Sequence, residues 1–178
     1  MNTRTGRQRR RQLRTLTQNK NLLAALVFLL RFNLFAIPLY LIIFSGYSSG
    51  LLIRMTADIT YGMLHATGIE AERSGNLISM PVENGNWAAV INWDCVGWKS
   101  MLVMLALVMA TPSCKRKKLY GIALLPLVYA INIIRIWFMF FFVSKFGLAY
   151  FGIVHAVVWS WGLLIAVLLL WLVWIRRF

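Results

Sequence analysis

The amino-acid sequence predicts an all-α integral membrane protein: a multi-pass helical bundle with about four spanning helices, an extra amphipathic or re-entrant helix and a small extracytoplasmic β-hairpin. Of its 178 residues, 60% are hydrophobic and 13% are charged, against about 25% charged residues in an ordinary soluble domain. Several apolar stretches reach the roughly 17 to 25 residues that cross a hydrocarbon layer about 30 Å thick. These observations exclude a water-soluble domain of this size.

The charged residues indicate which parts of the chain lie on each side of the membrane. Lys and Arg number 19 against five acidic residues. The basic residues concentrate in the first twenty residues, in the run 115–118 and at 176–177, which are the places that a positive-inside bias fills. All five acids lie between Asp58 and Asp94. We therefore predict a cell-membrane protein with both termini in the cytoplasm and the acidic segment outside.

The chain divides into a basic cytoplasmic tail, residues 1–20, and a single membrane-embedded domain, residues 21–178. The tail is polar and rich in Arg, so we expect a flexible arm that rests on anionic lipid headgroups, with no nucleic-acid partner. The apolar segment that follows is longer than the core of a signal peptide and lacks a small-residue cleavage site. We expect this segment to remain uncleaved.

The first spanning segment is predicted over Leu22–Ser45, with a kink at Pro38. The next segment, Leu51–Gly68, is poor spanning material because charged residues interrupt its apolar pattern. Arg54 and Asp58 stand one helical turn apart and can pair. An amphipathic or re-entrant helix at the outer surface is therefore favoured.

A short β-hairpin is predicted outside the membrane, ahead of the next span. Two β-prone runs, Asn76–Glu83 and Trp87–Asn92, flank the turn sequence Asn84-Gly85-Asn86, and Asn-Gly between such runs is a hairpin signal. Three further spans are then expected, running inward, outward and inward: Val96–Ala110, Leu119–Val143 and Ile153–Ile175.

Three polar residues from different spans are predicted to meet at the outer side. Cys95 opens one helix, Arg135 lies about 24 Å from the inner end of the next, and His155 starts the last. An Arg near the middle of a span costs roughly 2.5 to 3.5 kcal/mol on insertion scales and usually serves a site. A thiol, a guanidinium and an imidazole at one depth indicate nucleophilic chemistry.

Each of these residues has a specific expected role. Cys95 at a helix N-terminus should have a lowered pKa, and Gly97 allows another segment to approach closely. His155 fits a general base. The alternative is that Cys95 is inert, that His155 merely packs, and that Arg135 is structural and pairs with an acid such as Asp58 or Asp94.

The remaining thiol and the histidines indicate neither a disulfide nor a metal. An apolar helix separates Cys95 from Cys114, so the two sulfurs should lie about 28 Å apart and stay unpaired. The two His, two Cys and scattered acids show no metal-ligand spacing, and the chain has no Gly-rich phosphate loop. We therefore expect no metal and no cofactor.

These residues together resemble the exosortase/archaeosortase family. The resemblance rests on Cys95 followed by Gly97, on Asn132 and Arg135 in the pattern Asn-x-x-Arg, and on His155 opening the last span. It covers roughly residues 51–162, more than half of the chain. The family commonly reads Ala-Cys-Ser-Gly around the nucleophile, whereas this chain reads Asp-Cys-Val-Gly.

The resemblance implies a multi-pass cysteine transpeptidase acting on exported proteins that carry a C-terminal sorting signal: a short motif, a transmembrane helix and a basic tail. Such an enzyme cleaves the signal through a Cys thioester and transfers the new C-terminus to an amine acceptor, such as a membrane lipid. Cys95, Arg135 and His155 would be catalytic, and Asn132, Gly97 and Asp94 would support them.

A second hypothesis from another class is a non-catalytic multi-pass membrane protein, such as a small transporter or an assembly partner. In that protein Arg135 would be a counter-charge for a substrate or an ion.

Overall fold

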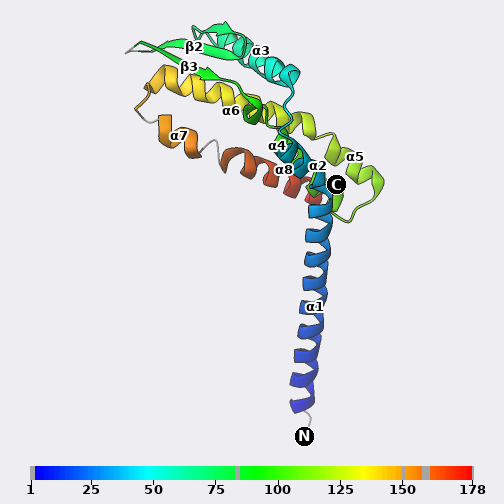
Figure 1. Cartoon of the computed structure of the whole chain (residues 1–178). Helices are drawn as coiled ribbons and strands as arrows, with labels where there is room; N and C mark the ends of the chain where they lie inside the picture. The colour runs from blue at the N-terminus through cyan, green and yellow to red at the C-terminus, as the bar shows by residue number, and fades with distance from the viewer. Residues whose placement is uncertain (1–2, 83–84, 150, 158–160, 178) are drawn as a thin grey trace.

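The chain folds into a mostly helical body with one small sheet at its edge (Figure 1). The computed structural model describes the backbone of residues 3–82, 85–149, 151–157 and 161–177, and the side chains of these ranges from residue 19 onward. In chain order the elements are α1 (Thr3–Phe35), α2 (Ile37–Ser45), α3 (Gly50–Ala66), β1 (Glu72–Ser74), β2 (Leu77–Val82), β3 (Gly85–Val90), η1 (Trp93–Val96), α4 (Trp98–Ala110), α5 (Lys115–Ile122), α6 (Leu125–Phe146), α7 (Phe151–Val157) and α8 (Leu163–Arg177).

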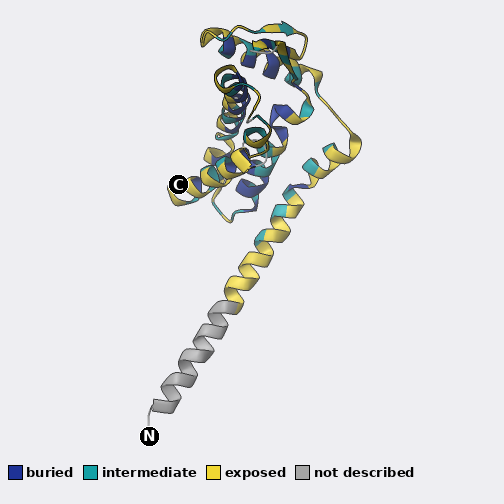
Figure 2. Cartoon of the chain, turned by 90° about the vertical axis from the view of Figure 1, so that its left-hand side faces the viewer, coloured by how far each residue is buried: buried dark blue, intermediate teal, exposed yellow. Residues whose placement is uncertain are grey.

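The described side chains of α1 are mostly exposed (Figure 2), while Phe28 near its C-terminal end packs against Trp171 of α8, with 5.8 Å between ring centroids. The prediction of a flexible arm is wrong, because helix begins at Thr3 and runs through the basic segment without a break. The helix is interrupted at Ala36, and Pro38 lies in the first turn of α2. This break accounts for the predicted kink, since proline cannot donate a helical hydrogen bond and its ring crowds the preceding turn.

Among the described residues, two helical stretches are long and apolar enough to cross a membrane, judged by length and composition. They are Asn19–Ser45, with 27 residues, and Lys115–Phe146, with 32 residues. The other two predicted spans correspond to shorter helices: α4 has 13 residues and α8 has 15. Residues 158–160 of the last predicted span lie outside the described residues.

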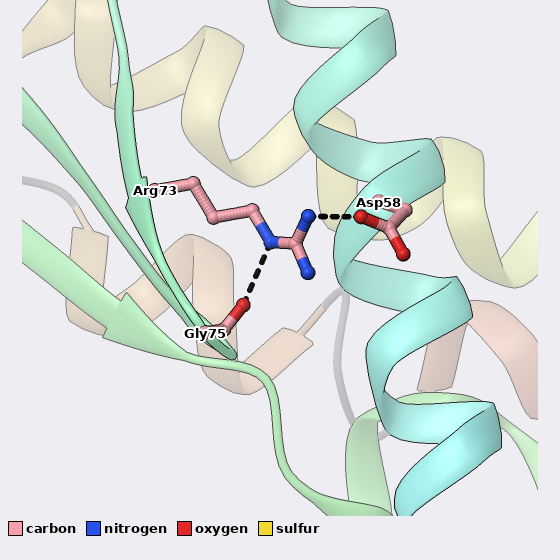
Figure 3. A network of polar contacts seen from close by, with 3 residues as sticks. All are labelled: Asp58, Arg73 and Gly75. Carbon is pink, nitrogen blue, oxygen red and sulfur yellow. Dashed lines mark hydrogen bonds and ion pairs between the residues drawn. The ribbon is translucent and has the colours of Figure 1, made fainter.

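Helix α3 packs against α6 through a buried face that includes Thr56, whose hydroxyl lies 3.0 Å from the Tyr129 hydroxyl. The predicted pairing of Arg54 with Asp58 is wrong. Asp58 pairs with Arg73 on β1, and Arg73 Nε also donates to the Gly75 carbonyl at 2.7 Å (Figure 3). The partner of Asp58 is therefore decided by tertiary contact and not by spacing along the helix. The Asp58–Arg73 pair connects α3 to the sheet.

Residues 72–90 form a three-stranded antiparallel sheet in the order β1-β2-β3, where the sequence predicts a two-stranded hairpin. Strands β2 and β3 pair from Leu77 opposite Val90 to Val82 opposite Gly85, and Asn84 of the predicted turn lies outside the described residues. The added strand β1 is too short and polar for alternation to reveal it. Ile78 and Met80 alternate along β2 and are both buried, so one face of the sheet covers the helices.

The described residues form two hydrophobic cores, and α6 contributes to both. The first, which we call the sheet-side core, joins α3, the sheet and α6: Ala57, Leu64, Ile78, Met80, Ile91, Cys95, Ile136, Phe140 and Val143. The second, the helical core, joins α4, α6 and α8: Met104, Leu107, Val108, Val128, Leu163, Val167 and Trp174.

The basic run that opens α5 caps two other helices. Lys118 Nζ donates to the Met109 carbonyl at 3.0 Å, at the end of α4. Lys117 Nζ donates to the Ile175 carbonyl at 2.9 Å, at the end of α8. Carbonyls at a helix C-terminus lack helical partners and carry partial negative charge, so an ammonium group stabilises both ends.

We predict that Gly121→Ala lowers the stability of the chain. A Cβ at Gly121, in α5, would lie 2.6 Å from Val108 Cγ1 and 3.0 Å from the Trp174 ring, and overpacking of this kind costs about 1–3 kcal/mol. Thermal unfolding in detergent measures the change. The matched control is Gly62→Ala in α3, where nothing lies within 4 Å and where alanine should stabilise the helix by up to ~1 kcal/mol. Equal midpoints for the two variants would contradict the packing.

Candidate functional site

Cys95 lies in the 3₁₀ turn η1, between the sheet and α4, and is 7% exposed. Its Sγ donates to Asn92 Oδ1 at 3.1 Å, and its backbone N–H donates to the same oxygen at 3.2 Å. Asn92 was not among the predicted site residues. Its signal is the spacing Asn92-x-x-Cys95, because an Asn before a helical turn typically accepts from the N–H three residues on. Asn92 therefore fixes the thiol and the turn together.

Two of the three predicted supporting residues, Gly97 and Asn132, meet at the Cys95 turn. Asn132, fully buried on α6, donates from Nδ2 to the Cys95 carbonyl at 2.7 Å. Gly97 has a φ of 79°, and a Cβ there would lie 2.7 Å from Asn132 Cγ. Glycine is needed at this position for the backbone conformation and for the close approach of α6. We call this contact between Asn132, the Cys95 carbonyl and Gly97 the Asn132 clamp.

Arg135 follows Asn132 by one turn of α6 and is 9% exposed. It acts electrostatically on Cys95. It also lines a cavity of about 320 Å³ together with Asp94, Lys99 and Leu163. Asp94 pairs with Lys99 at 2.6 Å, on the exposed surface. The Asp94 carboxylate therefore faces the ammonium group of Lys99.

His155 lies on α7, half-buried, and its ring stacks on Phe151 with 5.2 Å between centroids. His155 and Cys95 line the same cavity of about 100 Å³. The structure therefore brings the thiol and the imidazole to one cavity. Arg135 lines a different cavity, to which Asp94 and Gly97 of the same turn contribute.

The expected lowering of the Cys95 pKa is wrong. Burial of the thiol is the largest influence and raises its pKa, while the hydrogen bond to Asn92 and the charge of Arg135 oppose this rise and Asp94 adds to it. Two features explain why the pKa of Cys95 is raised and not lowered. The sheet-side core removes the thiol from water, and Gly97 separates Cys95 from the first turn of α4, where the helix dipole acts.

The structure also describes the two cysteines and the candidate metal ligands. Cys95 and Cys114 are both free thiols, as predicted. Among the described residues, no group of three or more His, Cys, Asp and Glu side chains could hold a metal ion.

The candidate site combines a buried thiol, an imidazole at the same cavity and a guanidinium that acts on the thiol. These groups are suited to nucleophilic acyl transfer.

Comparison with known proteins identifies the family. The model of one protein family, described as transmembrane exosortase (Exosortase_EpsH), matches residues 13–174, which include every residue of the candidate site. The comparisons with curated proteins and with solved structures found no match. Because the match extends over most of the chain, the protein is a membrane protein that belongs to the transmembrane exosortase family.

Proposed function

We propose that the chain is a cysteine transpeptidase that cleaves the C-terminal sorting signal of exported proteins and transfers the new C-terminus to an amine acceptor. The observation that carries this proposal is the shared cavity of Cys95 and His155, with Arg135 acting on the same thiol. Its partners would be exported proteins whose signal has a short motif, a transmembrane helix and a basic tail, together with membrane lipid, and not nucleic acid.

The proposed reaction passes through a thioester. His155 accepts the thiol proton while Cys95 Sγ attacks the scissile carbonyl, and the imidazolium then returns the proton to the leaving amine as the C–N bond breaks. An acceptor amine next attacks the thioester, the S–C bond breaks, and the departing thiolate regains a proton. Arg135 stabilises the thiolate and the negative charge that develops on the carbonyl oxygen.

The proposed topology places this chemistry on the extracytoplasmic side of the cell membrane, with both termini in the cytoplasm. We propose four crossings, made by α1 with α2, by α4, by α5 with α6, and by α7 with α8. This arrangement is supported by the charges at the two ends of α4. The acidic segment 58–94 precedes this helix and the basic run 115–118 follows it. The sorting signal would then approach Cys95 from within the bilayer.

A second function has one observation in its favour. The cavity lined by Arg135 also contains Lys99 and Asp94, while Cys95 lines a different one. In a non-catalytic transporter or assembly partner, Arg135 would serve there as a counter-charge.

A covalent adduct with a sorting signal tests the proposed function. We expect the chain, incubated in lipid vesicles with a candidate signal peptide, to form a thioester adduct that hydroxylamine releases and mass spectrometry detects. Cys95→Ala should abolish this adduct, and Cys114→Ala should retain it. His155→Gln should slow its formation by about 10²- to 10⁴-fold, the usual contribution of a general base. Processing that survives Cys95→Ala would favour the non-catalytic protein.

The pH dependence of thiol alkylation provides an independent prediction. In a Cys114→Ala chain, the iodoacetamide reaction of Cys95 should rise with pH to a midpoint above the ~8.5 of a free thiol, because burial raises the pKa of Cys95. Arg135→Gln should move this midpoint further upward, since Arg135 favours the thiolate. Arg116→Gln, which removes an exposed cation from α5, is the control. A midpoint at or below that of a free thiol would contradict the assigned environment.

A further inference from the structure

The cavity shared by Cys95 and His155 is small and almost wholly apolar. Its volume is about 100 Å³, and aromatic and aliphatic side chains surround the thiol and the imidazole. The aromatic ones come from three elements: Trp87 from β3, Phe140 from α6 and Phe151 from α7. Any group that reaches Cys95 Sγ through this cavity must fit among these rings.

Trp87 contacts the other two aromatic side chains of the cavity wall, Phe140 and Phe151. Its ring meets Phe140 edge-on at 5.2 Å between centroids and 62°, and meets Phe151 in the same way at 5.2 Å and 66°. Phe151 in turn stacks on His155 at 5.2 Å. Edge-to-face rings at these separations attract each other beyond the contribution of their buried area. The indole of Trp87 therefore connects the α6 wall of the cavity to the helix that carries His155.

The volume limits what the cavity accepts. An engineered apolar cavity of about 150 Å³ holds one benzene molecule, and one water molecule occupies about 30 Å³ of liquid. A cavity of about 100 Å³ has room for a carbonyl group with a methyl or similarly small aliphatic side chain. It lacks the room for an aromatic ring or a long side chain.

We propose that this cavity is a selectivity pocket for the residue that donates the scissile carbonyl, that it admits only a small aliphatic side chain there, and that Trp87 sets this limit. The inference rests on the proposed function and adds to it the chemical class of the residue joined to Cys95. Trp87 acts here as a specificity-determining residue that takes no part in proton transfer.

The strand that carries Trp87 supplies a matched pair of positions for a test. Ala89 lines the cavity, whereas its neighbour Ala88 is exposed. Successive strand residues point to opposite faces of a sheet. Ala89→Leu therefore fills the cavity, and Ala88→Leu adds the same side chain outside it.

Thiol labelling measures the size limit without any need for enzymatic turnover. In a Cys114→Ala chain, Cys95 is treated with methyl or benzyl methanethiosulfonate. The thiolate forms a mixed disulfide as the S–S bond of the reagent breaks and methanesulfinate leaves, and mass spectrometry gives the rates. The benzyl-to-methyl rate ratio is compared with that of the exposed Cys114 in a Cys95→Ala chain.

We expect this ratio at Cys95 to be about 10- to 200-fold below the ratio at Cys114, as for a pocket that excludes added carbon atoms. Trp87→Ala should raise the benzyl-to-methyl rate ratio at Cys95 toward the ratio at Cys114. Ala89→Leu should slow the reaction of the methyl reagent as well, whereas Ala88→Leu should change neither rate. An initial ratio equal to that of Cys114 would overturn the inference. If Trp87→Ala does not fold, equal rates for the two leucine variants would also overturn it.

A second arm uses two signal peptides that differ only in the residue donating the scissile carbonyl, alanine or phenylalanine. We expect adduct formation about 10- to 200-fold faster with alanine, and a smaller difference in Trp87→Ala. Equal rates for both peptides overturn the inference while the proposed function stands. The absence of any adduct with either peptide in every variant, with labelling still size-limited, removes the proposed function and with it the assignment of this cavity to a substrate.

Discussion

The site depends on the Asn132 clamp, the hydrogen bond from a fully buried amide on α6 to the Cys95 carbonyl. An amide donor in an apolar interior binds more strongly than in water and is costly to leave without its acceptor. The bond therefore holds α6 and the Cys95 turn at one separation, and Gly97 leaves the space that this separation requires. Since Arg135 follows one turn later on α6, the same contact sets its position relative to the thiol.

Helix α6 couples this clamp to both cores. Its C-terminal half contributes Ile136 and Phe140 to the sheet-side core, and its N-terminal half contributes Val128 to the helical core. Cys95 belongs to the sheet-side core, and residues of its turn line two cavities. A change in the packing of either core is therefore transmitted to the turn through α6, while α7, which carries His155, contacts Trp87 through Phe151.

The sequence predicted the features that depend on local pattern or on charge. Apolar length located the helices, Pro38 indicated the interruption between α1 and α2, and the order of Cys95, Arg135 and His155 indicated the family that the comparison confirms. It did not reveal contacts that depend on tertiary position. Arg73 could replace Arg54 as the partner of Asp58 only because β1 approaches α3. The direction of the Cys95 pKa depends on how the predicted hairpin packs over the thiol, which the hairpin signal alone does not reveal.

Burial at Cys95 has two opposite consequences for the proposed reaction, and together they explain the arrangement of the site. Removing the thiol from water raises its pKa, so less thiolate is present at neutral pH. A thiolate of higher pKa is intrinsically more nucleophilic, with a Brønsted coefficient of about 0.4–0.5, so part of the loss is recovered once the proton has gone. The proposed reaction then needs a base at the same cavity to remove that proton, and His155 lines that cavity. The side chains that bury the thiol also line the small cavity. In the proposed reaction, the selection of a small side chain and the need for a general base therefore both follow from the burial of Cys95.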